Sequence, residues 1–169
     1  MIHINIGSNL NSKYGSRFRN ISIALELLTN SKIKIKKISH FYKTPSYPNK
    51  DHPEFINIGL LSEYDSDYKK LLKETKIIEN KIGRIKSKKN DPRVCDIDII
   101  DFNGLKKEDK LLHLPHPRAH VRNFVLYPIK EIDPNWIHPV FKKSVDFLIN
   151  GLTQKSRIEI TRLRKSVII

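Results

Sequence analysis

Alternating and helical patterns of apolar residues divide the first half of the chain into distinct elements. Residues 2–6 alternate isoleucine with polar residues, which predicts a half-buried strand that ends at Gly7. Residues 14–29 carry apolar side chains three and four positions apart and predict an amphipathic helix. Residues 33–42 again have strand character, with a bulge where the alternation slips. Three prolines then interrupt residues 44–54, which predicts a rigid, polar loop.

The pattern continues with another strand, a helix and a strand. Residues 55–64 have strand character, and Asp65 or Ser66 can cap a helix that ends near Gly83. A basic loop follows, and residues 94–102 form the next long strand. The order strand–helix–strand–strand–helix–strand is that of a ferredoxin-like βαββαβ core, an α+β fold. We therefore expect an antiparallel sheet with the helices packed on one face.

The last third of the chain adds smaller elements to this core. Asn103-Gly104 is a strong two-residue hairpin signal, and the leucines at 111, 112 and 114 supply a short partner strand. Short helices are expected at 124–132 and 144–152, among loops. Residues 157–169 alternate enough to form an extra strand, with a loose tail as the alternative.

Length and charge narrow the class of protein less than they first suggest. The length of 169 residues suits a single domain over 1–169, and the net charge of +14 is typical of a nucleic-acid binder. However, the chain has 23 Lys against 9 Arg, together with 25 Ile, 13 Asn and 2 Ala, and A/T-rich codons explain that bias. Phosphate-binding surfaces favour Arg, because its planar fork matches phosphate geometry. The positions of the cations therefore matter more than their number.

Compartment signals are few but consistent. No apolar run approaches the length of a membrane span, and the first residues lack the basic-then-apolar order of a signal peptide. Cys95 is the one cysteine, on the apolar face of its predicted strand, where a buried structural thiol is favoured over a nucleophile. We expect a cytoplasmic protein without membrane contact.

Paired aspartates on the third long strand are the sharpest chemical signal. Because strand side chains alternate between faces, Asp96 and Asp98 point one way while Ile97 points the other. Adjacent carboxylates repel, and a divalent cation such as Mg²⁺ relieves that repulsion. A two-metal site for phosphoryl transfer is a second interpretation, and a solvated strand face is a third.

The loop before these aspartates is rich in cations. Lys81 to Arg93 holds six basic residues against Asp91 alone, and Arg93 lies three positions before Asp96. Cations and a metal at one spot suit a triphosphate. Neither familiar phosphate-binding loop motif occurs in the chain, so a bound nucleotide would be held in another way.

Three histidines offer a weaker alternative. His113, His116 and His120 have spacings of three and four, but prolines interrupt the run and no cysteine partner accompanies it. Zinc binding is therefore less favoured than a role for His116 beside a phosphate.

Taken in order, several motifs resemble the family of 6-hydroxymethyl-7,8-dihydropterin pyrophosphokinase, over roughly residues 2–150. The motifs are Ile6-Gly7-Ser8-Asn9-Leu10, Phe41 to Pro45, Phe55-Ile56-Asn57, Glu79 through Arg84, Asp91 to Ile99, and Leu114-Pro115-His116-Pro117-Arg118 to Arg122-Asn123-Phe124-Val125-Leu126. The resemblance implies a ferredoxin-like enzyme of folate biosynthesis. It would pass diphosphate from ATP to the pterin alcohol, giving the pterin diphosphate and AMP.

The same resemblance implies roles for individual residues. Asp96 and Asp98 would hold two Mg²⁺ ions, and these aspartates with Arg84 and Arg93 would form the catalytic group. ATP would be bound by Glu79, Arg84, Lys86, Arg93, His116 and Arg122, and the pterin by Thr44, Pro45, Phe55, Asn57 and Phe124. The loops 44–54 and 84–92 would act as lids.

The chain also departs from the usual family pattern. Family members often have Tyr at Phe55, Pro at Ser46 and Arg at Lys86, and some have an aromatic residue near Asn90. Lys86 keeps the charge but loses the bidentate fork, which implies a weaker ATP contact. Asn90 cannot stack as an aromatic ring does, which implies a less tightly sealed lid.

Two rival functions remain in view. A ferredoxin-like RNA-binding module would carry aromatic residues on its central strands, whereas the paired aspartates would repel a phosphate backbone. A metal-dependent nuclease or nucleotidyl transferase would normally need a further carboxylate near the pair. We therefore expect a monofunctional, monomeric enzyme that acts on two small molecules, ATP and the pterin alcohol, and binds no nucleic acid.

Overall fold

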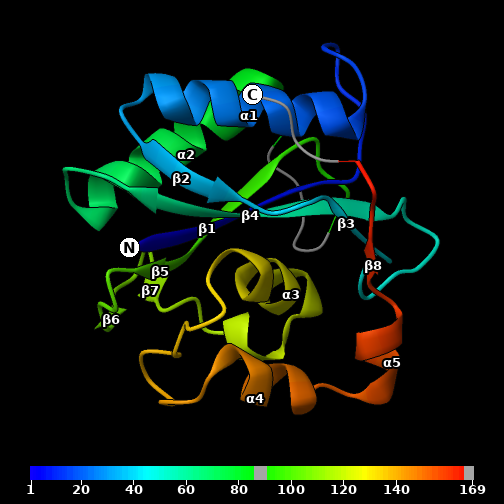
Figure 1. Cartoon of the computed structure of the whole chain (residues 1–169). Helices are drawn as coiled ribbons and strands as arrows, with labels where there is room; N and C mark the ends of the chain where they lie inside the picture. Colours follow the sequence, from blue (N-terminus) through cyan, green and yellow to red (C-terminus); the bar gives the residue numbers. More distant parts are fainter. Residues whose placement is uncertain (86–90, 166–169) are drawn as a thin grey trace.

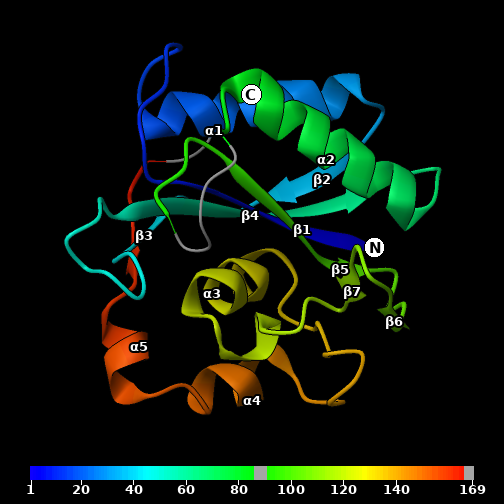
Figure 2. The ribbon, with the colours of Figure 1, turned by 180° about the vertical axis from the view of Figure 1, so that it is seen from behind.

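An antiparallel sheet runs through the centre of the protein, with helices on both of its faces (Figures 1 and 2). The computed structural model describes residues 1–85 and 91–165. The strand order is β5-β1-β4-β3-β8, and β2 also pairs with β4. The strands are β1 (Ile2–Ser8), β2 (Lys34–Ile38), β3 (Tyr42–Thr44), β4 (Phe55–Glu63), β5 (Asp96–Phe102) and β8 (Thr161–Arg162). Every pairing is antiparallel, which confirms the predicted ferredoxin-like core.

Two long helices cover one face of this sheet, as predicted. They are α1 (Arg17–Asn30) and α2 (Tyr68–Ile82). The cap of α2 is Asp67, whose carboxylate accepts hydrogen bonds from two backbone N–H groups of the first turn, so the prediction of Asp65 or Ser66 is wrong. Gly83 ends the helix with a φ of 105°, the left-handed conformation that glycine adopts most readily.

The other face is covered as well, which the prediction of one-sided packing missed. It carries the 3₁₀ turn η1 (Ala119–Val121) and the helices α3 (Asn123–Ile132), α4 (Val145–Asn150) and α5 (Gln154–Ile158). The close approach of α3 requires Gly59 on β4, because a Cβ there would lie 2.7 Å from Cβ of Pro128. The apolar residues consequently form two cores, one on each side of the sheet.

The predicted hairpin after β5 is only half right. Asn103 and Gly104 have φ values of 54° and 72° and make a tight turn, but the chain then leaves the sheet. The partner strand β7 (His113–Leu114) pairs with β6 (Lys107–Glu108) in a separate two-stranded sheet. It is the backbone N–H of His116 that returns to β5, donating to the carbonyl of Ile100 at 2.8 Å.

The other expectations for the chain are met in outline. The pairing of β2 with β4 shifts register between Ile35 and Lys37, at the predicted bulge. Within the predicted stretch 157–169, the strand β8 pairs with β3, while 166–169 lie outside the described residues. In the described part of the chain, no helix has the length and apolar character that crossing a membrane requires.

Candidate active site

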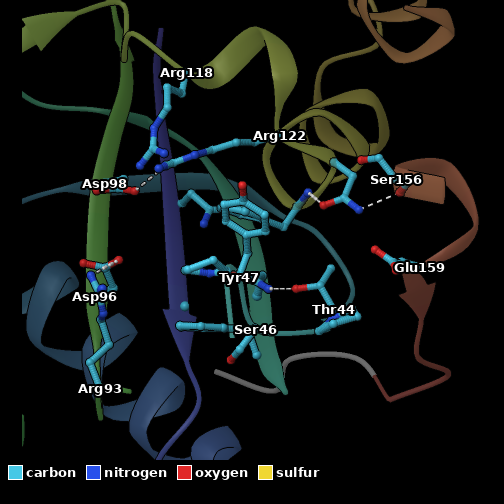
Figure 3. Close-up of a pocket in the computed structure, with 18 of the residues that line it drawn as sticks. Thr44, Ser46, Tyr47, Arg93, Asp96, Asp98, Arg118, Arg122, Ser156 and Glu159 are labelled. Carbon is cyan, nitrogen blue, oxygen red and sulfur yellow. Dashed lines mark hydrogen bonds and ion pairs between the residues drawn. The ribbon is translucent and has the colours of Figure 1, made fainter. Parts of the chain in front are cut away.

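A cavity of about 1010 Å³ opens where β1 ends and β4 and β5 begin, between the sheet and α3 (Figure 3). Asp96 and Asp98 extend from β5 on one side of it. Thr44 and the Pro-rich loop 44–54 line another part, and α5 completes the rim. The cavity therefore joins a charged half near β5 to a less charged half near β3 and α5.

Asp96 is held by two arginines from the basic loop. Its Oδ1 accepts a hydrogen bond from Arg84 at 2.7 Å, and its Oδ2 accepts one from Arg93 at 2.9 Å. Burial alone would raise the pKa of Asp96, but the charges of Arg93 and Arg84 outweigh it and lower that pKa. Asp96 is therefore ionised in the folded protein, with both oxygens engaged.

Asp98 lies two residues further along the same face of β5 and is less well compensated. Its Oδ2 is 3.4 Å from Nη1 of Arg122 and 3.9 Å from Nε2 of His116. Burial, and next the charge of Asp96, raise the pKa of Asp98 to about 6. Burial and the neighbouring charge of Asp96 thus both disfavour the ionised form of Asp98, and an added cation would offset that cost.

Glu79 lies behind the arginines and does not line the cavity. Its side chain is only 1% exposed, and its oxygens accept hydrogen bonds from Arg84 at 2.5 Å, Lys76 at 2.9 Å and the Ile97 backbone N–H at 2.7 Å. These three donors occupy the carboxylate. The structure therefore does not place Glu79 in direct contact with a ligand in the cavity, contrary to the predicted contact with ATP. Glu79 instead ties α2 to β5 and holds Arg84 in place.

The histidine at the edge of the charged half is neutral. Burial, together with the charges of Arg122 and Arg118, lowers the pKa of His116 to about 4. The backbone N–H of Arg118 lies 3.1 Å from its Nδ1 and Nη1 of Arg122 lies 3.3 Å from its Nε2, so an N–H donor faces each ring nitrogen. The neutral ring keeps one N–H group, which can donate to a phosphate oxygen.

Neither the zinc site nor a reactive cysteine finds support. Among the described residues, no group of three or more His, Cys, Asp or Glu side chains is arranged to hold a metal ion. His120 packs against the ring of Phe141, with ring centroids 4.5 Å apart, rather than beside His116. Cys95 is buried, and burial raises the pKa of its thiol, as expected for a structural cysteine.

The less charged half contains the residues expected to bind a pterin. Phe55, Asn57, Thr44 and Phe124 all line the cavity, and so does Pro45. The Asn57 amide donates to the Thr44 hydroxyl at 3.2 Å, which fixes the orientation of both side chains (Figure 3).

Two further contacts shape this half of the cavity. The guanidinium of Arg122 lies 5.3 Å from the ring centroid of Phe124 and links the two halves. Gly7 permits the close approach of β1, because a Cβ there would lie 2.8 Å from Oδ1 of Asn57.

A second, smaller cavity of about 220 Å³ adjoins the charged half. The two cavities share the side chains of Lys76, Asp98 and His116. The remainder of the small cavity is largely apolar and is lined by Leu72, Ile97, Ile99, Leu111, Leu112, His113 and Pro117. A ligand with an apolar ring at one end and charged groups at the other would fit across the boundary.

Sequence reasoning missed several residues that line these cavities. Lys76 is the cation that joins them, and it was hidden among the many lysines of α2. Arg118 lies beside Arg122 in Figure 3, and its place within the Leu-Pro-His-Pro-Arg motif was a usable signal. The predicted ATP contact Lys86 and the departure at Asn90 lie outside the described residues.

An α+β fold with paired carboxylates among arginines, at the start of a central strand, defines a class of protein suited to binding a polyanionic ligand and its metal. The family model of 7,8-dihydro-6-hydroxymethylpterin-pyrophosphokinase (HPPK) matches residues 3–134. The chain belongs to this family.

Relatives of similar length support the assignment. The 2-amino-4-hydroxy-6-hydroxymethyldihydropteridine pyrophosphokinase of Aquifex aeolicus is 34% identical over 142 residues, covering 84% of this chain and 86% of that protein. The Bacillus subtilis protein of the same name is 34% identical over 131 residues, covering 77% and 76%. Both of these proteins are named as pyrophosphokinases, and the comparisons give no support to the RNA-binding alternative.

Other relatives are much longer than this chain. Folic acid synthesis protein FOL1 of Dictyostelium discoideum is 37% identical over 139 residues, which are 82% of this chain and only 20% of that protein. The crystal structure of Plasmodium falciparum HPPK-DHPS superposes with a TM-score of 0.66 at 16% identity, covering 89% of this chain and 44% of that one. This likeness establishes the shared fold.

Proposed function

We propose that the protein transfers the diphosphoryl group of ATP to the hydroxymethyl oxygen of 6-hydroxymethyl-7,8-dihydropterin. The substrate oxygen attacks the β-phosphorus, the bond from that phosphorus to the bridging oxygen of the α-phosphate breaks, and AMP leaves. The observation that carries the proposal is one cavity that unites a cation-rich half around Asp96 and Asp98 with an aromatic and amide-bearing half around Asn57 and Phe124.

The charged half suits the triphosphate of ATP. Arg84, Arg93 and Arg122 converge there, and their planar forks match phosphate oxygens. The adjoining apolar cavity suits the adenine ring, which leaves Lys76 and His116 near the sugar and the phosphates. Attack at phosphorus depends mainly on alignment and on neutralised charge, and these residues supply both.

The two aspartates fit magnesium as the accompanying metal. Mg²⁺ prefers one or two carboxylates completed by water and substrate phosphates, so the lack of a third ligand among the described side chains is compatible with it. Burial and the charge of Asp96 raise the pKa of Asp98 despite Arg122 at 3.4 Å, so a further cation beside Asp98 would stabilise its ionised form. We propose that Asp96 and Asp98 hold two Mg²⁺ ions; bound there, the ions would neutralise the phosphate charge and align the reacting groups.

The other half suits a flat heterocycle with polar edges. Phe55 and Phe124 provide ring faces, and Asn57 and Thr44 provide hydrogen-bonding groups of fixed orientation. Described residues of one chain provide both halves, so we propose that the enzyme works as a monomer. The free thiol of Cys95 suits the reducing cytoplasm, where we place the protein.

The test is AMP formation by the purified protein with ATP, Mg²⁺ and the pterin alcohol, omitting each component in turn. We expect AMP only when all three are present. Asp98→Ala is expected to abolish this turnover while the far-ultraviolet circular dichroism stays unchanged. Asp65→Asn, at an exposed ion pair with Lys34 outside the cavity, is the control and should match the wild type. Full activity of Asp98→Ala would contradict the metal assignment.

A further inference from the structure

The C-terminal segment 153–163 contributes to the cavity although it lies beyond the stretch that the family model matches. Four of its side chains line the cavity: Thr153, Lys155, Ser156 and Glu159. Figure 3 shows Ser156 and Glu159 on the side opposite Asp96 and Asp98, next to Thr44. The segment therefore borders the half that we assign to the pterin.

Backbone pairing fixes this segment to the edge of the sheet. In β8, Arg162 pairs with Tyr42 and Thr161 with Lys43, and the Leu163 backbone N–H donates to the carbonyl of Phe41 at 2.8 Å. The strand β3 that it covers ends at Thr44, where the Pro-rich loop 44–54 begins. The position of α5 is consequently set by the same strand that positions the loop.

Helix α5 also contacts both walls of the pterin half. On one side, the amide of Asn123, the residue that precedes Phe124, donates to the carbonyl of Ser156 at 2.6 Å. On the other side, Nζ of Lys50 lies 2.5 Å from Oε1 of Glu159. The helix and its C-cap residue Glu159 thus span the cavity rim from α3 to the tip of the loop.

The base of the Pro-rich loop is held separately from its tip. The Ser46 hydroxyl donates to the carbonyl of Pro53 at 2.6 Å, and the Asn9 amide donates to the same carbonyl at 3.1 Å. Lys50 lies between these ends, and its ion pair with Glu159 joins the tip to α5. The pair therefore acts where the loop is furthest from its anchored base.

We propose that Glu159 is a positioning residue that holds the Pro-rich loop over the pterin half through Lys50, an inference that rests on the proposed function. A pair this exposed adds little to the stability of the whole fold, but a loop needs only a small bias to favour one conformation. Ordering the loop before the substrate arrives lowers the entropy lost on binding. The consequence is a lower KM for the pterin, with little change in kcat or in the KM for ATP.

The experiment compares Glu159→Gln with the wild-type chain. We expect the KM for the pterin to rise about three- to fivefold, with kcat and the KM for ATP within about twofold. The charge-exchanged double variant Lys50→Glu/Glu159→Lys should recover most of the loss. The matched control is Glu63→Gln, which removes an exposed Lys36–Glu63 ion pair of 2.8 Å outside the cavity and should leave all three constants unchanged.

Hydrogen exchange of the ligand-free proteins provides a readout independent of turnover. We expect faster exchange in residues 46–54 of Glu159→Gln and unchanged exchange elsewhere. Unaltered KM and exchange, or a parallel rise in both KM values, would overturn the proposal. If the wild type makes no pterin-dependent AMP, the proposed function fails, and exchange alone then decides: faster exchange confined to the loop supports the role of Glu159, and unchanged exchange overturns it.

Discussion

Replacing Glu79 by Gln tests whether a buried carboxylate organises the charged half of the site. The side chain is 1% exposed and accepts from Arg84, Lys76 and the backbone of Ile97. The amide oxygen of Gln can still accept from Arg84 and Ile97, but its NH₂ group then faces the ammonium of Lys76. Half of the Lys76 side chain is exposed, so it can turn to water at little cost.

The expected loss follows from the hydrogen bonds that survive. The hydrogen bonds from Arg84 and Ile97 remain but lose the negative charge of their acceptor, which weakens each by about 1 kcal/mol. Glu79→Gln should therefore lower the free energy of unfolding by about 2 kcal/mol. Glu79→Ala removes the acceptor altogether, leaves the buried N–H of Ile97 without this partner and opens a cavity. It should cost about 4 kcal/mol.

Urea unfolding at pH 7 measures both losses, with Lys76→Gln as the control that removes only the exposed partner. That control should lose less than about 1 kcal/mol. In the assay for AMP, Glu79→Gln should raise the KM for ATP more than the KM for the pterin, because Arg84 loses a charged anchor. Equal stability of Glu79→Gln and the wild type, or equal losses for the Gln and Ala variants, would refute this reasoning.

Three further variants test the fold and the pterin half. Gly59→Ala should lose about 2 kcal/mol in urea unfolding, because its Cβ would meet Pro128 at 2.7 Å; unchanged stability would show that α3 moves away freely. Burial lowers the pKa of His138 from 6.5 to about 4, so the unfolded chain binds more protons between these values and stability decreases as the pH is lowered. The loss from pH 7 to pH 5 should be about 2 kcal/mol from this group, and His138→Asn should reduce the pH dependence by that amount; an unchanged slope would contradict it. Asn57→Ala should raise the KM for the pterin about tenfold in steady-state assays, because it removes the partner of Thr44, whereas an unchanged KM would place the pterin elsewhere.

Local periodicity predicted the parts of the site that depend on one strand. The two-residue repeat of β5 requires Asp96 and Asp98 to share a face, because Ile97 and Ile99 are buried in the core on the other face. The arginine three residues before Asp96 follows from the same local geometry. These features were predictable because the hydrophobic effect fixes which face of the strand is buried.

Pairings between distant segments were not predictable in this way. The turn at Gly104 is encoded locally, but the strand that pairs next depends on packing, and β7 joined β6 instead of β5. The ion pair of Lys50 with Glu159 joins residues 109 positions apart, and no repeat in the sequence marks it. The burial of Glu79 likewise depends on how α2 packs against β5, which helical periodicity alone does not specify.

The central claim is that one cavity aligns ATP with the pterin alcohol for transfer of a diphosphoryl group. Phosphorus-31 NMR of the reaction catalysed by the wild-type chain tests it most directly, because it identifies both phosphorus-containing products. We expect AMP and the pterin diphosphate in equal amounts. ADP with a pterin monophosphate, or ATP hydrolysis that does not depend on the pterin, would contradict it.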